Sequence, residues 1–110
     1  MNIKTRVLDI LKQTNTPVYY ATNYEANDDT FIIFFINQTK THSCADDEEA
    51  SIYYHINVQI ISVTDYDDLA DNIIKLMRQA NFKRLNEADT YDADLGFYTK
   101  AIQFSYVHFL

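Results

Sequence analysis

The chain has very few of the residues that make tight turns, with one glycine and one proline in 110 residues. Average proteins contain about 7% glycine and about 5% proline. This shortage argues against a fold with many glycine turns and favours long continuous elements joined by polar loops. Aromatic residues are abundant instead, with nine tyrosines and seven phenylalanines.

Cysteine and cationic residues are also scarce. The single cysteine, Cys44, cannot form an internal disulfide, which is typical of a protein that folds inside the cell. Nine Lys and Arg against 16 Asp and Glu give a net charge of −7. This charge argues against sequence-specific or general nucleic-acid binding, because that affinity comes mostly from cations that neutralise phosphates.

Long hydrophobic runs are missing too. No run approaches the ~20 apolar residues that span a bilayer, and Asp9 lies where a signal peptide would be apolar. We therefore expect no membrane contact. The length predicts one domain over residues 1–110, and an apolar content of 47% excludes an intrinsically disordered chain.

Hydrophobic periodicity predicts helices at residues 2–13 and at about 65–80. In the first helix Ile3, Val7 and Leu11 recur at helical spacing, and Asn2 is a candidate N-cap. The second helix has aspartates in its first turn and Arg78 in its last, as the helix dipole prefers.

Strands are predicted at residues 18–21, 30–38, 51–63, 82–85 and 98–109. Residues 51–63 alternate cleanly between apolar and polar side chains, and a strand of this length spans about 40 Å. The order α-β-β-β-α-β-β predicts an α+β fold, in which two helices pack on one face of an antiparallel, or alternatively mixed, sheet of four to five strands.

Carboxylates gather in two stretches, residues 39–50 and 86–96, which we predict to be acidic loops. A run of carboxylates repels itself and stays solvated. The candidate protein-interaction residues in these loops are Asp46, Asp47, Glu48, Glu49, Glu87, Asp89, Tyr91, Asp92 and Asp94.

No motif for catalysis or metal binding is present. The sequence lacks a glycine-rich phosphate loop, a nucleophile elbow and a Cys-His signature. The segment around His42 and Cys44 offers too few soft ligands for zinc, and the carboxylates at residues 46–49 lack the alternation and the glycine of an EF-hand. We therefore expect neither enzyme activity nor a metal or cofactor.

The strand at residues 30–38 is apolar on both of its faces. It is therefore buried on both sides, or its outer face meets a partner. Two long strands beside it provide more flat surface than two short helices cover, and aromatic residues are favoured at interfaces. This pattern favours homo-oligomerisation through Phe31, Ile33 and Phe35, the alternative being a monomer with an unusually aromatic core.

From the second helix onward the sequence resembles a family of tail-completion or tail-terminator proteins from long-tailed phages and prophages of Gram-positive bacteria. The resemblance covers roughly residues 45–106, and it lies in the segments DYDDL at 65–69, NFKR at 81–84 and ADTYDADLGFYTK at 88–100. The acidic segment at 45–49, followed by YHINVQI at 54–60, is similar to the same family.

Two positions depart from the family pattern. Asn81 replaces a frequent glycine but can still adopt a left-handed C-cap conformation. Thr99 replaces a frequent histidine, so no role of that histidine is transferred.

The resemblance implies a virion protein, made in the bacterial cytoplasm, that lies in the tail at the head–tail interface. Such proteins form a hexameric ring that caps the tail tube, ends its polymerisation and offers a surface to the head–tail connector or stopper protein. The acidic stretches would meet the major tail tube protein or the connector, and would keep DNA from sticking in the bore. Two alternatives stay open, namely another neck protein such as a stopper or adaptor, and an acidic regulator that binds a basic partner.

Overall fold

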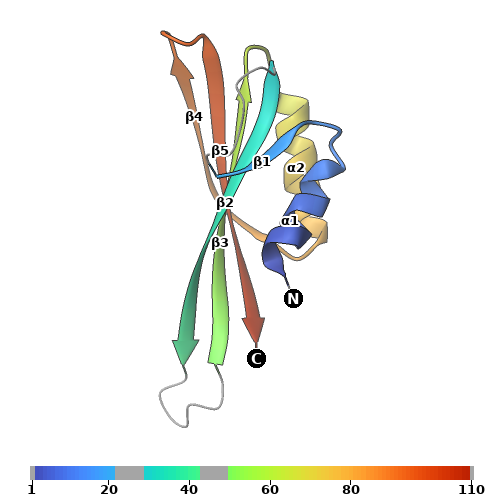
Figure 1. The fold of residues 1–110 in the computed structure, drawn as a ribbon, viewed down its shortest axis with the longest axis vertical. Helices are drawn as coiled ribbons and strands as arrows, with labels where there is room; N and C mark the ends of the chain where they lie inside the picture. The colour runs from blue at the N-terminus through green and yellow to red at the C-terminus, as the bar shows by residue number, and fades with distance from the viewer. Residues whose placement is uncertain (1, 22–28, 43–49, 110) are drawn as a thin grey trace.

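The computed structural model describes residues 2–21, 29–42 and 50–109, and it describes the side chains of residues 39–42 and 50 no further than their backbone. Within these ranges the chain forms two helices and five strands (Figure 1). Their bounds in chain order are α1 Ile3–Lys12, β1 Val18–Tyr20, β2 Thr30–His42, β3 Ala50–Ser62, α2 Asp67–Gln79, β4 Lys83–Asp92 and β5 Phe97–Phe109.

The strands form one sheet in the order β1-β2-β3-β5-β4. Strand β1 runs parallel to β2, whereas every other neighbouring pair is antiparallel, so the sheet is mixed. Both helices cover the same face of this sheet (Figure 1). The predicted α+β fold and its element order are therefore confirmed.

The core lies between the helices and the sheet. Helix α1 contributes the apolar stripe that its periodicity predicts, and α2 contributes Ala70, Ile73 and Met77. Every second residue of the long strands faces these helices, because strand side chains alternate between the two faces. The fully buried sheet residues of this core are Ile32, Phe34, Ile56, Val58, Ile60, Ile102 and Phe104.

Arg6 connects the helix layer to the sheet. Its Nη2 donates to the carbonyl oxygen of Ala80 at 2.9 Å, and its Nη1 lies 3.4 Å from the hydroxyl of Tyr106. The guanidinium also lies over the rings of Phe82 and Tyr106. Contacts with aromatic faces and a carbonyl oxygen stabilise a partly buried guanidinium at this position.

The second helix is slightly shorter than the predicted range of about 65–80. Helix α2 begins at Asp67 rather than at residue 65, because Asp65 lies before the helix and its Oδ1 accepts the backbone N–H of Asp67 at 3.0 Å. At the other end Asn81 has φ +70°, so the left-handed conformation expected for it is confirmed. The N-cap role of Asn2 is confirmed as well, since its side chain accepts the N–H of Thr5.

The prediction of a loop over residues 39–50 is wrong at both of its ends. Strands β2 and β3 pair up to His42 and Ala50, so residues 39–42 and 50 lie on strands. These strands carry the hairpin well beyond the helix layer (Figure 1). Backbone pairing continues there because a long antiparallel ladder needs β-compatible residues rather than a buried face on each side.

The prediction of a short strand at 82–85 followed by an acidic loop at 86–96 is wrong. Strand β4 runs from Lys83 to Asp92 and pairs with β5, which leaves a turn of only four residues, 93–96. Glu87, Asp89, Tyr91 and Asp92 therefore lie on a strand, and only Asp94 lies in the turn. All ten residues of β4 are exposed, so this edge strand lacks the apolar alternation by which strands are recognised.

In the described part of the chain, neither helix has the length and apolar character needed to cross a bilayer.

Candidate protein-interaction site

The turn from β4 into β5 lies at one end of the molecule (Figure 1). Three apolar side chains beside this turn are exposed. Tyr91, Leu95 and Tyr98 are 55%, 69% and 47% exposed. Tyr91 and Tyr98 are paired across the two strands, with ring centroids 4.5 Å apart. We refer to Tyr91, Asp92, Asp94, Leu95 and Tyr98 as the hairpin tip. An exposed aromatic cluster with a polar rim is typical of a protein-contact surface.

Hydrogen bonds hold the turn of the hairpin tip. Oδ1 of Asp92 accepts the backbone N–H groups of Asp94 and Leu95 at 3.0 and 3.1 Å. The N–H of Gly96 donates to the carbonyl oxygen of Asp92 at 2.8 Å, and Gly96 has φ +72°, a conformation that glycine adopts without strain. The one glycine of the sequence therefore closes this turn, and the tip presents its side chains in a defined shape.

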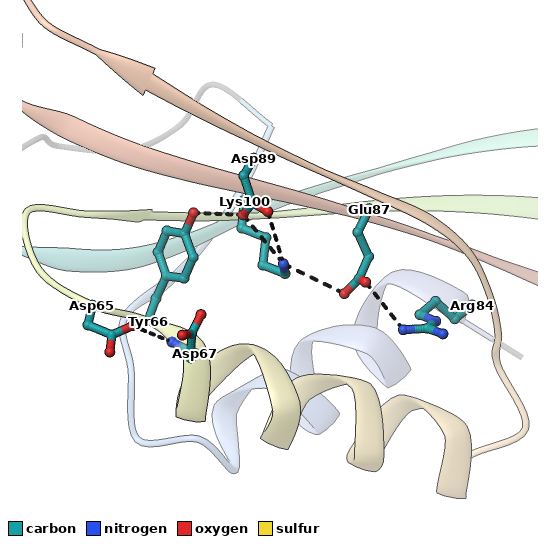
Figure 2. A network of polar contacts seen from close by, with 7 residues as sticks. All are labelled: Asp65, Tyr66, Asp67, Arg84, Glu87, Asp89 and Lys100. Carbon is teal, nitrogen blue, oxygen red and sulfur yellow. Dashed lines mark hydrogen bonds and ion pairs between the residues drawn. The ribbon is translucent and has the colours of Figure 1, made fainter.

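A polar network next to the tip connects the beginning of α2 to the edge of the sheet (Figure 2). The hydroxyl of Tyr66 donates to Oδ1 of Asp89 at 2.8 Å, and Nζ of Lys100 lies 3.4 Å from both oxygens of the same carboxylate. Lys100 also lies 3.8 Å from Glu87, which pairs in turn with Arg84 at 3.3 Å. Two of the predicted acidic residues are thus brought together and partly neutralised by cations.

The network shifts two pKa values. Burial of the phenol is the largest influence on Tyr66, and the hydrogen bond and charge of Asp89 add to it, so that the pKa of Tyr66 rises to about 12. The hydrogen bond from Tyr66 is the largest influence on Asp89. Together with Lys100 it lowers the pKa of this carboxyl despite partial desolvation. The pair is therefore a neutral phenol and a carboxylate throughout the physiological range.

A hollow of about 420 Å³ lies between this network and the hairpin tip. Val63, Thr64 and Asp65 from the connection before α2 line it together with Tyr66 and Tyr98. Val63 is 40% exposed, so the hollow combines apolar and acidic lining. Its composition suits an apolar or cationic side chain of another protein.

The predicted interaction residues of β2, Phe31, Ile33 and Phe35, lie on the sheet face opposite the helices. Phe31 and Ile33 are buried, at 1% and 6% exposure, and the ring of Phe31 packs edge-on against Tyr19 and Phe97. Phe35 lies on the same face and is partly exposed. Phe31 thus belongs to a small aromatic cluster within the chain and Ile33 is buried near it on the same strand, and an interface role for this strand stays a prediction.

Asp46, Asp47, Glu48 and Glu49 lie outside the described residues, as does Cys44. Their proposed contact with tail proteins stays a prediction. Within the ranges that the structure describes, no three His, Cys, Asp or Glu side chains are grouped so that they could hold a metal ion.

Sequence reasoning missed several members of the site, namely Tyr66, Arg84, Leu95, Tyr98 and Lys100. Hairpin geometry would have found Tyr98 and Lys100. A turn closed by the pair of Asp92 and Phe97 places Tyr91 opposite Tyr98 and Asp89 opposite Lys100. Placing the glycine at position 96 in a hairpin turn was the missing step, because the acidic composition of the segment favoured a loop.

Comparison with solved structures finds the same fold in a chain from the virion of a native gene transfer agent (GTA) particle. The TM-score is 0.66, with 11% sequence identity, over 94% of this chain and 92% of that chain. No protein-family model matches the sequence. No curated protein matches it either. The similarity in fold thus extends over nearly the full length of both chains.

Proposed function

We propose that the protein is a structural component of a phage virion, and specifically a tail-terminator or tail-completion protein. The observation that carries this proposal is the fold shared with a virion chain over 94% of the sequence. The resemblance of residues 45–106 to phage tail-terminator proteins points to the same class independently. The exposed aromatic tip and the acidic surface support a role in contacts with other proteins.

In this role the protein forms a ring, for which we propose six copies, on the end of the finished tail tube. A closed ring needs heterologous contacts, so each copy presents two different surfaces to its neighbours. The ring stops addition of the major tail tube protein on one side and receives the head–tail connector or stopper protein on the other. The acidic segment at residues 46–49 faces these partners.

Deletion of the gene from its phage tests the proposal. We expect tails of uncontrolled length that do not join heads, and restoration of normal tails by the wild-type gene. Replacing Asp46, Asp47, Glu48 and Glu49 by Ser should reduce head joining while the protein still folds. Tails of normal length that join heads in the deletion strain would contradict the proposed function. Normal joining with the four serines would contradict only the role of the acidic segment.

A stopper in the neck is the second candidate, because a virion chain with this fold and an acidic contact surface suits either position. Binding of the purified protein separates the two. A terminator should bind and cap isolated tail tubes, whereas a stopper should bind the connector and leave tube growth unchanged.

A further inference from the structure

Charge is distributed unevenly along α2. Asp67 and Asp68 lie in its first turn, whereas Lys75 and Arg78 lie on exposed positions toward its end. The helix starts near the hairpin tip and ends at the opposite side of the helix layer (Figure 1). The tip adds Asp92 and Asp94 to the acidic end. The acidic and cationic residues of α2 are 7 to 11 positions apart, which is about 10–17 Å along the helix axis.

The cationic surface is a shallow hollow of about 500 Å³ on the exposed side of α2. Lys75 and Arg78 line it together with Ile74, which is half-buried and supplies an apolar floor, and with Asp71 and Gln79. The hollow thus offers two cations against one carboxylate, beside apolar surface. We call it the α2 hollow.

The hairpin tip offers the complementary features. It carries two carboxylates beside the exposed side chains of Tyr91, Leu95 and Tyr98. No described side chain donates a hydrogen bond to the carboxylate of Asp94, so that carboxylate is open to a partner cation. Arg78 and Lys75 can pair with these carboxylates, and Arg78 can also stack on a tyrosine ring.

We propose that the hairpin tip of one copy docks into the α2 hollow of a neighbouring copy. This contact rests on the proposed ring, and it names the two surfaces that form it. The tip and the hollow differ and lie at opposite ends of α2, so the contact is heterologous and can repeat around a ring. Opposite charges on the two surfaces favour a second copy as the occupant, and they disfavour pairing of tip with tip or of hollow with hollow.

Strand pairing through the free edge of β4 is the less suitable route to a ring. Half of the ten residues of β4 are charged, and the register shifts at Leu85. Charges and irregularities of this kind protect an edge strand from pairing with another chain. The side chains of the tip, rather than the backbone of β4, therefore carry the contact.

Charge reversal tests the contact by sedimentation velocity over a range of protein concentrations. The tip variant combines Asp92→Asn, which keeps the acceptor of the turn, with Asp94→Lys. The hollow variant combines Lys75→Glu with Arg78→Glu. Each should weaken self-association by about tenfold, since two exposed ion pairs become repulsive or neutral. An equimolar mixture of the two variants should associate better than either variant alone.

Single substitutions on α1 provide matched controls. Asp9→Lys and Lys12→Glu change the charge in the same directions at exposed sites outside both surfaces, and should leave association unchanged. Circular dichroism checks the fold of every variant. If Glu at the end of α2 prevents folding, Lys75→Gln with Arg78→Gln removes the cations without reversing the charge and should still weaken association.

Three outcomes would overturn the contact. If the tip and hollow variants associate as strongly as the wild type, the ring forms through other surfaces and the proposed function stands. If the variants bind tail tubes less well but keep their self-association, the tip contacts the tube protein instead of a second copy. If the wild type stays monomeric at every concentration and on tail tubes, the protein forms no ring. The tail length in the deletion strain then shows whether the proposed function fails together with the contact.

Discussion

Tyr66 illustrates how one side chain fixes the position of an element. It is the residue before α2, and its hydroxyl reaches across to Asp89 on β4. Its side chain thereby links α2 to β4, which backbone hydrogen bonds do not connect because the two elements belong to different layers. A hydrogen bond to a charged acceptor contributes about 1.5–3 kcal/mol when shielded and less at a surface. Because the Asp89 side chain is 59% exposed, we expect a contribution near or below the lower value.

The pKa of the Tyr66 phenol is raised to about 12, so this group should titrate well above the ordinary tyrosine value of 10.0. The raised pKa means that the folded protein retains this proton more firmly than the unfolded chain. Its stabilising contribution is therefore complete below about pH 10 and is lost as the pH rises through about 12. Carbon-13 NMR of the labelled tyrosine rings measures this titration.

The same titration in the Asp89→Asn variant separates the causes of the shift. Burial is the largest of them, so removing the negative charge should lower the pKa of Tyr66 only part of the way toward 10. The Tyr91→Phe variant provides the control, because it leaves the pair intact. A pKa that stays unchanged in Asp89→Asn would show that Asp89 has no influence on Tyr66.

At the scale of elements, the end of α2 shows how a local sequence determines where a helix stops. The N–H of Asn81 donates to the carbonyl of Arg78, and the N–H of Phe82 donates to that of Met77, each at 3.0 Å. With Asn81 in the left-handed conformation, this is a Schellman motif, and Phe82 and Met77 are both in the core, as such a motif prefers. The motif turns the chain from the helix layer back into the sheet.

Substitutions at Asn81 should follow the cost of the left-handed conformation. Asn81→Gly should be neutral or slightly stabilising, whereas Asn81→Val should destabilise the fold by about 1–2 kcal/mol because Cβ meets the following carbonyl. Urea unfolding measures both. The exposed neighbour Gln79 lies in ordinary helix, so Gln79→Val should cost only about 0.7 kcal/mol or less. Equal losses at both positions would contradict a special role of the backbone conformation.

These elements also show how far the sequence predicts the fold. Both helices and the strands with an apolar face follow from periodicity, because each must bury one side. Strand β4 does not follow, since an exposed edge strand is held by backbone pairing and by the ion pairs of Lys100, Glu87 and Asp89. Within the site, the acidic residues and Tyr91 follow from composition. Tyr98 and Lys100 required the register of β4 on β5, and Tyr66 required the position of α2 against β4.

At the scale of the whole molecule, the protein is elongated, with extents of 53 × 26 × 23 Å and a Cα radius of gyration of 15.5 Å. A compact domain of this length has a radius of gyration of about 13 Å. The excess comes from the hairpin of β2 and β3, which extends beyond the layer of α1 and α2 (Figure 1). The core lies between the helices and the sheet, so we expect the fold to form without the far end of the hairpin of β2 and β3.

Shortening the hairpin of β2 and β3 should therefore abolish head joining and preserve self-association. Residues 41–51 can be excised and replaced by a short glycine-containing turn that joins Lys40 to Ile52, whose backbones are paired. The variant should fold with a stability within about 1 kcal/mol of the wild type, because the described residues of the excised segment do not belong to the core cluster. It should still self-associate, since the hairpin tip and the α2 hollow are untouched.

The shortened protein should nevertheless fail to join tails to heads, because it lacks the acidic segment at residues 46–49 that we assign to partner contact. Sedimentation velocity and counts of joined virions by electron microscopy measure the two properties separately. A variant that keeps the full hairpin but carries Ser at positions 46–49 provides the control, and it isolates the charge of the segment from its reach. If the shortened protein joins heads normally, the hairpin of β2 and β3 is not the partner surface. If the shortened protein no longer self-associates, the hairpin of β2 and β3 contributes to the ring as well.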